Sequence, residues 1–145
     1  MSDLADLYRD VVLDHARTPH GFGLRDGAAA ESHQLNPTCG DEVTVRLHLG
    51  PEGAIEGISW EGHGCAISQS SASILADLAP GDSPEQLRSR IAGFRAMMRS
   101  RGEVEGDEAL LGDAVVFQSA SRYVARVKCA MLAWVAVEDA LLKLG

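Results

Sequence analysis

The chain has 145 residues, 46% of them hydrophobic, which suffices for one domain with a substantial core and is too short for two comfortable ones. It carries 13 Lys and Arg against 21 Asp and Glu, and the net charge of −8 argues against nucleic-acid binding and against adhesion to anionic membranes. No apolar run is long enough to cross a membrane, and the first six residues are acidic where a secretion signal would be basic, so we expect a single cytoplasmic domain over residues 1–145.

The first predicted element is a helix over residues 3–17. Apolar residues recur there at spacings of three and four, which gives the helix one apolar face. That face consists of Leu4, Leu7, Tyr8, Val11, Val12 and His15. The stretch Thr18-Pro19-His20-Gly21 stops the helix. We expect His15 to pack at the helix edge and His20 to be a solvated loop residue.

A β-hairpin is predicted next, after a glycine- and alanine-rich loop and a short strand near residues 33–35, where we expect His33 on the surface. Residues 42–49 alternate between apolar and polar side chains, which indicates a half-buried strand. A turn over residues 50–53 returns the chain as an antiparallel strand over residues 55–62, with Gly57 as a candidate bulge.

Three more helices complete the predicted fold. The first opens at Cys65 and runs to about Ala79, and its small side chains suit close packing on the sheet. The second begins at the capping sequence Ser83-Pro84-Glu85-Gln86. The last spans residues 119–142 and is apolar on a broad surface, so we expect Met131 and Trp134 in the core. The acidic segment over residues 102–113 is predicted to be a mobile connection.

The second of these helices also carries a series of arginines beside its apolar stripe. They are Arg88, Arg90, Arg95, Arg99 and Arg101. In an acidic protein, a basic face of this kind is either a docking surface or an ordinary solvated helix face, and the sequence leaves both open. The elements together predict an α+β fold, with a small, mostly antiparallel three-stranded sheet packed by helices on one face.

Three cysteines and one aspartate form the candidate metal site. Cys39 and Asp41 lie on either side of Gly40, directly before the predicted hairpin, and Cys65 follows it. Because a hairpin returns to its starting point, Cys39 and Cys65 are expected at the same end of the sheet. Cys65 opens a helix, whose N-terminus favours a thiolate. Cys129 lies near the start of the last helix, where it would meet the other two.

This set of three sulfurs and one oxygen suits tetrahedral zinc. Iron is also compatible, because iron–sulfur clusters are built on cysteine thiolates, so the ligands alone leave the metal open. Arg126 and Lys128 would offset the excess negative charge of three thiolates and a carboxylate. Read by itself, Cys129 would pass as a small buried hydrophobe.

Four stretches of the sequence resemble the IscU/NifU-N family of iron–sulfur cluster assembly proteins. They are Asp14-His15 with Pro19, Asn36-Pro37-Thr38-Cys39-Gly40-Asp41, Gly62-His63-Gly64-Cys65-Ala66-Ile67-Ser68, and Arg126-Val127-Lys128-Cys129-Ala130. They span nearly the whole chain in the family's order. Three departures from IscU favour the SufU branch or weaken a chaperone-dependent role: Lys128 stands where IscU carries histidine, the segment before it looks longer, and no Leu-Pro-Pro-Val-Lys stretch precedes Cys129.

The resemblance implies a SufU/IscU-like domain that binds zinc through Cys39, Asp41, Cys65 and Cys129. It implies that a SufS-type, pyridoxal-phosphate-dependent cysteine desulfurase supplies sulfur, which passes on to downstream SUF assembly proteins. A histidine of the desulfurase would replace Cys39 on zinc and free it as the sulfur acceptor. Arg126 would contact the loop of that histidine, or Asp41.

Three functions therefore stand against each other. The leading one is a zinc-dependent sulfur acceptor, or sulfurtransferase, that relays persulfide during iron–sulfur cluster biogenesis. The second is a scaffold on which a [2Fe–2S] cluster is assembled and passed on. The third is a domain whose zinc is purely structural and whose role is to bind a partner.

Overall fold

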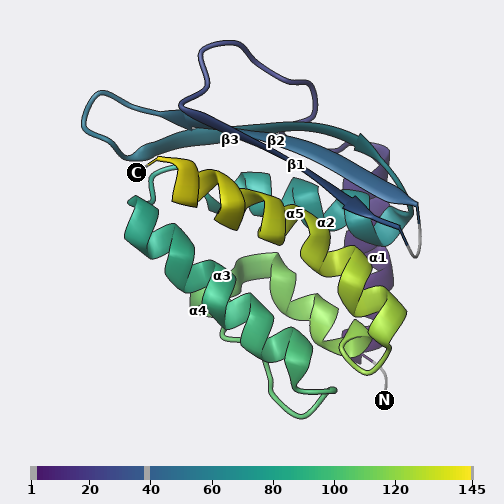
Figure 1. Cartoon of the computed structure of the whole chain (residues 1–145). Coiled ribbons are helices and arrows are strands. Elements are labelled where there is room, and N and C mark those ends of the chain that lie inside the picture. The colour runs from purple at the N-terminus through teal and green to yellow at the C-terminus, as the bar shows by residue number, and fades with distance from the viewer. Residues whose placement is uncertain (1–2, 38–39, 145) are drawn as a thin grey trace.

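The computed structural model describes residues 3–37 and 40–144, and it places a three-stranded sheet over a layer of helices that cover one of its faces (Figure 1). The strands β1 (Ala30–Asn36), β2 (Asp41–Leu49) and β3 (Ile55–His63) are antiparallel neighbours in chain order. This arrangement confirms the predicted α+β class.

The hairpin of β2 and β3 forms as predicted, with Val45 opposite Trp60 and Glu42 opposite His63. Its register shifts between His48 and Leu49, beside Gly57, where a bulge was expected. His48 faces away from the row of buried apolar residues in β2, yet it is also buried. Its Nε2 forms a hydrogen bond of 2.7 Å with the hydroxyl of Ser59 on β3.

Five α-helices and one 3-10 helix occur in the described part of the chain. They are α1 (Asp3–Arg17), α2 (Ala66–Leu78), α3 (Pro84–Arg99), α4 (Glu108–Leu111), the 3-10 helix η1 (Gly112–Ala120) and α5 (Val124–Lys143). The helix α5 lies against β1 and β2, while α2 lies beside β3 and α1. Helix α3 and η1 pack below them, on the side away from the sheet (Figure 1).

The caps and boundaries of the helices differ in how well the sequence predicted them. The capping box of α3 is present, with the Gln86 N–H donating to Ser83 Oγ at 3.1 Å. The predicted start of the last helix at residue 119 is wrong, since η1 occupies those residues and α5 begins only after Tyr123. The acidic segment likewise contains α4 instead of being wholly irregular.

The core between the layers is centred on Trp134, which is fully buried. Its ring stacks on Phe94 with centroids 4.0 Å apart, and its Nε1–H donates to Ser71 Oγ at 2.8 Å. The Ser71 hydroxyl in turn donates to the Ala130 carbonyl of α5 at 2.6 Å. A bond this short between a side chain and the backbone of the neighbouring helix shows that the small residues of α2 let the two helices pack closely. Met131, predicted in the core, is only half-buried because it lines a groove between α3 and α5.

Candidate metal centre

Three of the four predicted ligands come from different elements that meet at one end of the sheet. Asp41 is the first residue of β2, Cys65 is the N-cap of α2, and Cys129 lies in the second turn of α5. One ligand atom of each lies within 4.8 Å of the others. Cys39 lies outside the described residues. The hairpin places Cys65 beside Asp41 at the end of the sheet where Cys65 was expected, and the packing of α5 on the sheet adds Cys129.

The carboxylate of Asp41 is buried and held in place by the start of α2. Its Oδ1 accepts a hydrogen bond from the Cys65 N–H at 3.1 Å, and its Oδ2 lies 4.0 Å from Cys65 Sγ. An N–H group at a helix N-terminus suits a carboxylate, since it has no partner within the helix. Cys129 is buried, whereas Cys65 is exposed. The centre thus has a fixed inner side and one sulfur that faces solvent.

Gly64 leaves room beside this carboxylate. A Cβ atom at Gly64 would lie 2.3 Å from Asp41 Oδ1 and 2.6 Å from Ser68 Oγ, far inside van der Waals contact. Two sulfurs and one carboxylate oxygen at these separations, with a glycine beside them, fit a thiophilic divalent cation such as zinc. The ligand roles of Cys39, Asp41, Cys65 and Cys129 stay predictions.

Two further side chains border the centre. Burial raises the pKa of the half-buried Tyr8, Arg126 opposes that rise, and the charges of Cys65 and Cys129 add to it, so Tyr8 lies near both thiols. Sequence patterns predicted Tyr8 only as part of the apolar face of α1. Arg126 is exposed and its guanidinium lies 4.7 Å from the centre of the Tyr123 ring. Within the described residues it forms no ion pair with Asp41. Its contact with the cysteine desulfurase stays a prediction.

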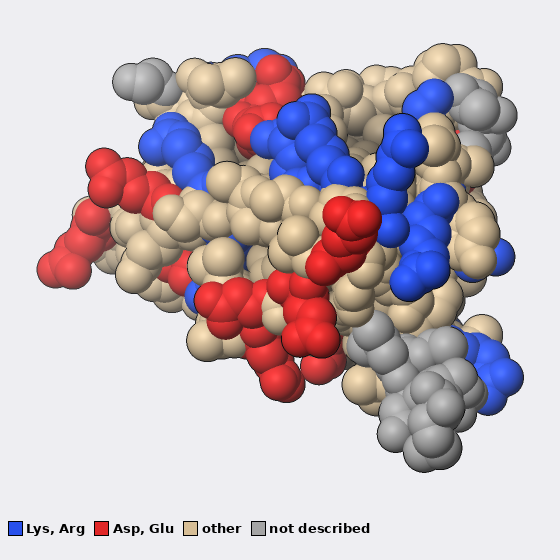
Figure 2. Space-filling view, turned by 90° about the horizontal axis from the view of Figure 1, so that it is seen from below, with Lys and Arg blue, Asp and Glu red and all other residues tan. Residues whose placement is uncertain are grey.

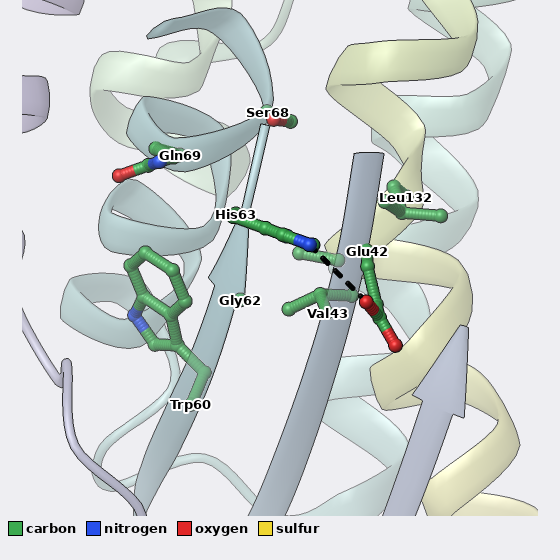
Figure 3. A pocket seen from close by; sticks show the side chains of 9 residues that line it. Glu42, Val43, Trp60, Gly62, His63, Ser68, Gln69 and Leu132 are labelled. Carbon is green, nitrogen blue, oxygen red and sulfur yellow. Dashed lines mark ion pairs between the residues drawn. The ribbon is translucent and has the colours of Figure 1, made fainter. Parts of the chain in front are cut away.

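Glu42 lies next to Asp41 on β2 and holds two histidines at the edge of the centre. Figure 3 shows His63 extending from β3 toward Glu42 across a small pocket, with Nε2 at 3.3 Å from Oε1. His33 on β1 pairs with the other oxygen of Glu42 at 2.5 Å. His33 is exposed, as predicted.

A groove lies between α3 and α5, and its lining includes Lys128, the residue before Cys129 in the chain. It has a volume of about 480 Å³, an apolar floor that includes Met98, Val127 and Met131, and a rim that includes Arg99, Arg101 and Lys128. Figure 2 shows Lys and Arg side chains gathered on this side of the molecule, with acidic side chains gathered next to them.

The arginines of α3 do not form one free basic face. Arg90 pairs with Asp82 at 2.6 Å, and Arg95 forms a bidentate pair with Glu138 at 2.9 and 2.7 Å. The Arg95 guanidinium holds the pKa of Glu138 below its ordinary value. Among the described residues, Arg99 and Arg101 have no such ion pair. The exposed Arg88 likewise has no ion pair within the described residues, and it donates to the Leu141 carbonyl away from the groove. Arg99 and Arg101, the latter just beyond α3, are the available arginines at the groove.

No helix in residues 3–37 and 40–144 is long and apolar enough to span a bilayer.

Comparison with known proteins matches residues 7–141 to the model of the NifU-like N-terminal domain. The chain is 36% identical over 142 residues to the iron-sulfur cluster assembly scaffold protein IscU of Streptococcus pyogenes, covering 97% of this chain and 86% of the relative. It is 36% identical over 143 residues to the zinc-dependent sulfurtransferase SufU of Bacillus subtilis, covering 98% of this chain and 94% of the relative.

Solved structures agree with this placement. A putative iron-sulfur cluster assembly scaffold protein for the SUF system from Fervidobacterium islandicum superposes with a TM-score of 0.81 at 31% identity, covering 93% of this chain and 96% of that one. The N-terminal part of a nitrogen-fixing NifU-like protein from Brucella abortus gives a TM-score of 0.85 at 25% identity, covering 96% and 94%. The predicted resemblance is thereby confirmed, and the chain belongs to the family of NifU-like N-terminal domains.

Proposed function

We propose that this protein is a zinc-dependent sulfur acceptor that takes persulfide sulfur from a cysteine desulfurase during iron–sulfur cluster assembly. The observation that carries the proposal is the convergence of Asp41, Cys65 and Cys129 within 4.8 Å, with a third thiol, Cys39, two residues before Asp41 in the chain. The name of the Bacillus subtilis relative, a zinc-dependent sulfurtransferase, supports the same reading over nearly all of this chain.

Zinc bound by these residues would keep the cysteines ionised and shielded until sulfur is delivered. Two of the thiols are poor candidates for leaving such a site. Cys129 is buried on α5, and Cys65 caps α2 with its N–H bonded to Asp41. Cys39 belongs to neither helix, and we assign it as the sulfur acceptor.

The transfer step is a thiol–persulfide exchange. The Cys39 thiolate attacks the outer sulfur of a persulfide on the desulfurase, a new sulfur–sulfur bond forms at Cys39, and the bond within the donor persulfide breaks. The donor cysteine leaves as a thiolate, so the exchange needs no external oxidant or reductant. We expect a SufS-type, pyridoxal-phosphate-dependent enzyme as donor, with Arg126 contacting it beside the centre.

The exposed side of the centre and the groove next to Lys128 offer the donor a docking surface. Arg99 and Arg101 lie there without a described ion pair, in a protein of net charge −8, so the surface is complementary to an acidic segment with apolar side chains. We expect Arg99→Glu to slow desulfurase binding severalfold. Arg88→Glu, on the same helix away from the groove, is the matched control.

The decisive experiment replaces Cys39 by alanine. We expect Cys39→Ala to abolish stimulation of the desulfurase and to prevent addition of one sulfur atom to this protein, as seen by mass spectrometry. Circular dichroism should remain that of the wild type. Full stimulation by the folded variant would overturn the relay.

The second candidate function is a scaffold for a [2Fe–2S] cluster. It is favoured by the name of the Streptococcus relative, a cluster assembly scaffold protein. Protein purified without added metal separates the two, because a relay protein should contain zinc and be colourless, whereas a scaffold should contain iron. If the zinc were purely structural, chelation should unfold the chain, and a folded but inactive apo-protein would exclude that role.

A further inference from the structure

A second cluster of metal-ligating side chains lies at the other end of α2. His15 is in the last turn of α1, His20 follows that helix, and Asp77 is in the last turn of α2. One ligand atom of each lies within 4.8 Å of the others. Asp77 follows Cys65 by twelve positions along the chain, which corresponds to about 18 Å of helix, so this cluster is separate from the thiol centre.

The first histidine of this cluster is buried and oriented by a serine. His15 Nδ1 lies 2.6 Å from Ser73 Oγ, and the His20 N–H donates to the same oxygen at 2.7 Å. The direction of the bond between His15 and Ser73 depends on the tautomer of the ring, and metal binding at Nε2 requires the tautomer in which Nδ1 carries the proton and donates to Ser73 Oγ. That tautomer leaves Nε2 of His15 as a ligand, and metal-bound histidines generally have such a partner on the other ring nitrogen.

The other two ligands lie at the surface and are already paired. His20 Nδ1 lies 2.6 Å from Asp77 Oδ2, and both side chains are half exposed. The two rings are close as well, with centroids 4.8 Å apart. A divalent ion bound to His20 Nδ1 and Asp77 Oδ2 would displace the proton between them, and the neutral His20 ring would then carry its single proton on Nε2.

An open path leads from solvent to this cluster. A pocket of about 430 Å³ is lined by His15 and His20 together with Asp14, Arg17 and Thr18. An ion held by two imidazoles and one carboxylate would therefore keep a coordination position that faces the pocket. Ligands of this kind suit zinc and the neighbouring divalent transition metals, without the preference for soft ions that thiolates give.

We propose that His15, His20 and Asp77 form a second metal site of this protein, which binds a divalent first-row transition-metal ion through nitrogen and oxygen. Its ligands belong to α1, to the connection that follows it and to α2, so the ion would fasten that connection to α2. The proposal is independent of the sulfur relay.

Cobalt(II) titration of protein whose thiol centre is filled with zinc tests the site. Cobalt on nitrogen and oxygen ligands gives weak visible bands, whereas cobalt on thiolates adds intense near-ultraviolet charge-transfer bands. We expect one further equivalent of cobalt to bind with weak bands only. We expect His20→Gln and Asp77→Asn each to weaken that binding tenfold or more, and a matched change in another histidine–carboxylate pair, His33→Gln, to leave it unchanged.

Cys65→Ser serves as a second control, because it damages the thiol centre alone. Cobalt binding with weak bands should persist in Cys65→Ser even if the sulfur relay is wrong, which separates the two proposals. The second site would be overturned by charge-transfer bands in the added equivalent, by binding that His20→Gln and Asp77→Asn leave intact, or by equal loss in His33→Gln. Circular dichroism of His20→Gln and Asp77→Asn, both at half-exposed positions, checks that the fold is kept.

Discussion

At the N-terminus of α2, two sulfurs and a carboxylate meet from three distant segments, and the Cys65 N–H donates a hydrogen bond to Asp41 at 3.1 Å. At the C-terminus of the same helix, two imidazoles and a carboxylate are linked to one another and to Ser73 by bonds of 2.6 to 2.7 Å. The first cluster is thus positioned mainly by the three elements that carry its ligands. The second is positioned by its own hydrogen bonds.

This contrast indicates different tasks for the two clusters. In the proposed relay, Cys65 and Cys129 stay on the metal and Cys39 leaves it to accept sulfur, so the thiol centre depends on one exchangeable ligand. Side chains that bond to one another hold their geometry before the ion arrives, which suits retention of an ion. The following changes are designed to separate the clusters or to show that they depend on one another.

The largest effect should come from Gly64→Ala. The added methyl group would displace the Asp41 carboxylate, and we expect zinc affinity at the thiol centre to fall about 100-fold while the histidine cluster keeps its affinity. Competition with a chromophoric chelator measures both. Gly50→Ala is the matched control, because its Cβ would meet only the Ala54 carbonyl at 3.7 Å. Undiminished affinity in Gly64→Ala would remove Asp41 from the ligand set.

Ser71→Ala should affect the helix that both clusters share. Loss of the Ser71 hydroxyl leaves the buried Trp134 Nε1–H without an acceptor, and we expect the free energy of unfolding to fall by about 1–3 kcal/mol. Urea denaturation measures this. Ser70→Ala is the control, since the Ser70 hydroxyl donates only to the Ile67 carbonyl within α2, and it should cost less. Equal losses would show that the bond between α2 and α5 adds nothing.

Ser73→Ala should act on the histidine cluster alone. Without the hydroxyl, the His15 ring loses its orienting partner, and we expect about tenfold weaker cobalt binding there with zinc affinity unchanged at the thiols. Ser68→Ala, next to Cys65, provides the reciprocal control and should leave the histidine cluster unaffected. A loss at the thiols in Ser73→Ala would mean that the clusters are coupled through α2.

The smallest effect concerns a buried histidine remote from both clusters. Burial lowers the pKa of His48 below its ordinary value of 6.5, Arg25 and Arg46 lower it further, and Glu56 opposes them. The folded state therefore binds a proton at His48 less readily than the unfolded state does. The free energy of unfolding should be highest above about pH 7 and should decline as the pH falls through about 6.5 toward the pKa of the folded state. We expect the loss of stability to be small, because the shift concerns a single group.

The His48→Gln variant checks that assignment. It should flatten the decline when unfolding in urea is compared at about pH 7.5 and about pH 5.5. If the decline in stability were the same in His48→Gln, the pH dependence would belong to other groups. Metal affinities of the two clusters measured at one pH would then have to be corrected for that dependence.

The sequence was sufficient wherever a local pattern determined the outcome. The alternation in β2, the turn after Gly50 and the capping box at Ser83 predicted their elements. The hairpin predicted that Cys39 and Cys65 share one end of the sheet, and Cys65 does lie there, beside Asp41. The start of α5 was missed because the apolar residues before it resemble a continuing helix, whereas they form η1.

The histidine cluster could not be predicted in the same way. His15 and His20 suggested a helix edge and a loop, and His20 is indeed exposed, but their partner Asp77 lies 57 residues beyond His20 in the chain. No periodicity in the sequence connects them. Only the packing of α1 on α2 does so, and the same holds for Tyr8 beside the thiols.

Asp41 has one more consequence, which follows from its place at the head of β2. Its side chain continues the row of Val43, Val45 and Leu47, all buried on the helix-covered face of the sheet, because every second residue of a strand points the same way. The face of the sheet to which the carboxylate points therefore depends on whether Asp41 and Val43 are separated by an even or an odd number of positions. Inserting or deleting a single residue between Asp41 and Val43 would turn the oxygen ligand to the outer face while each cysteine kept its sequence neighbours, so any working variant of this centre must preserve an even spacing there.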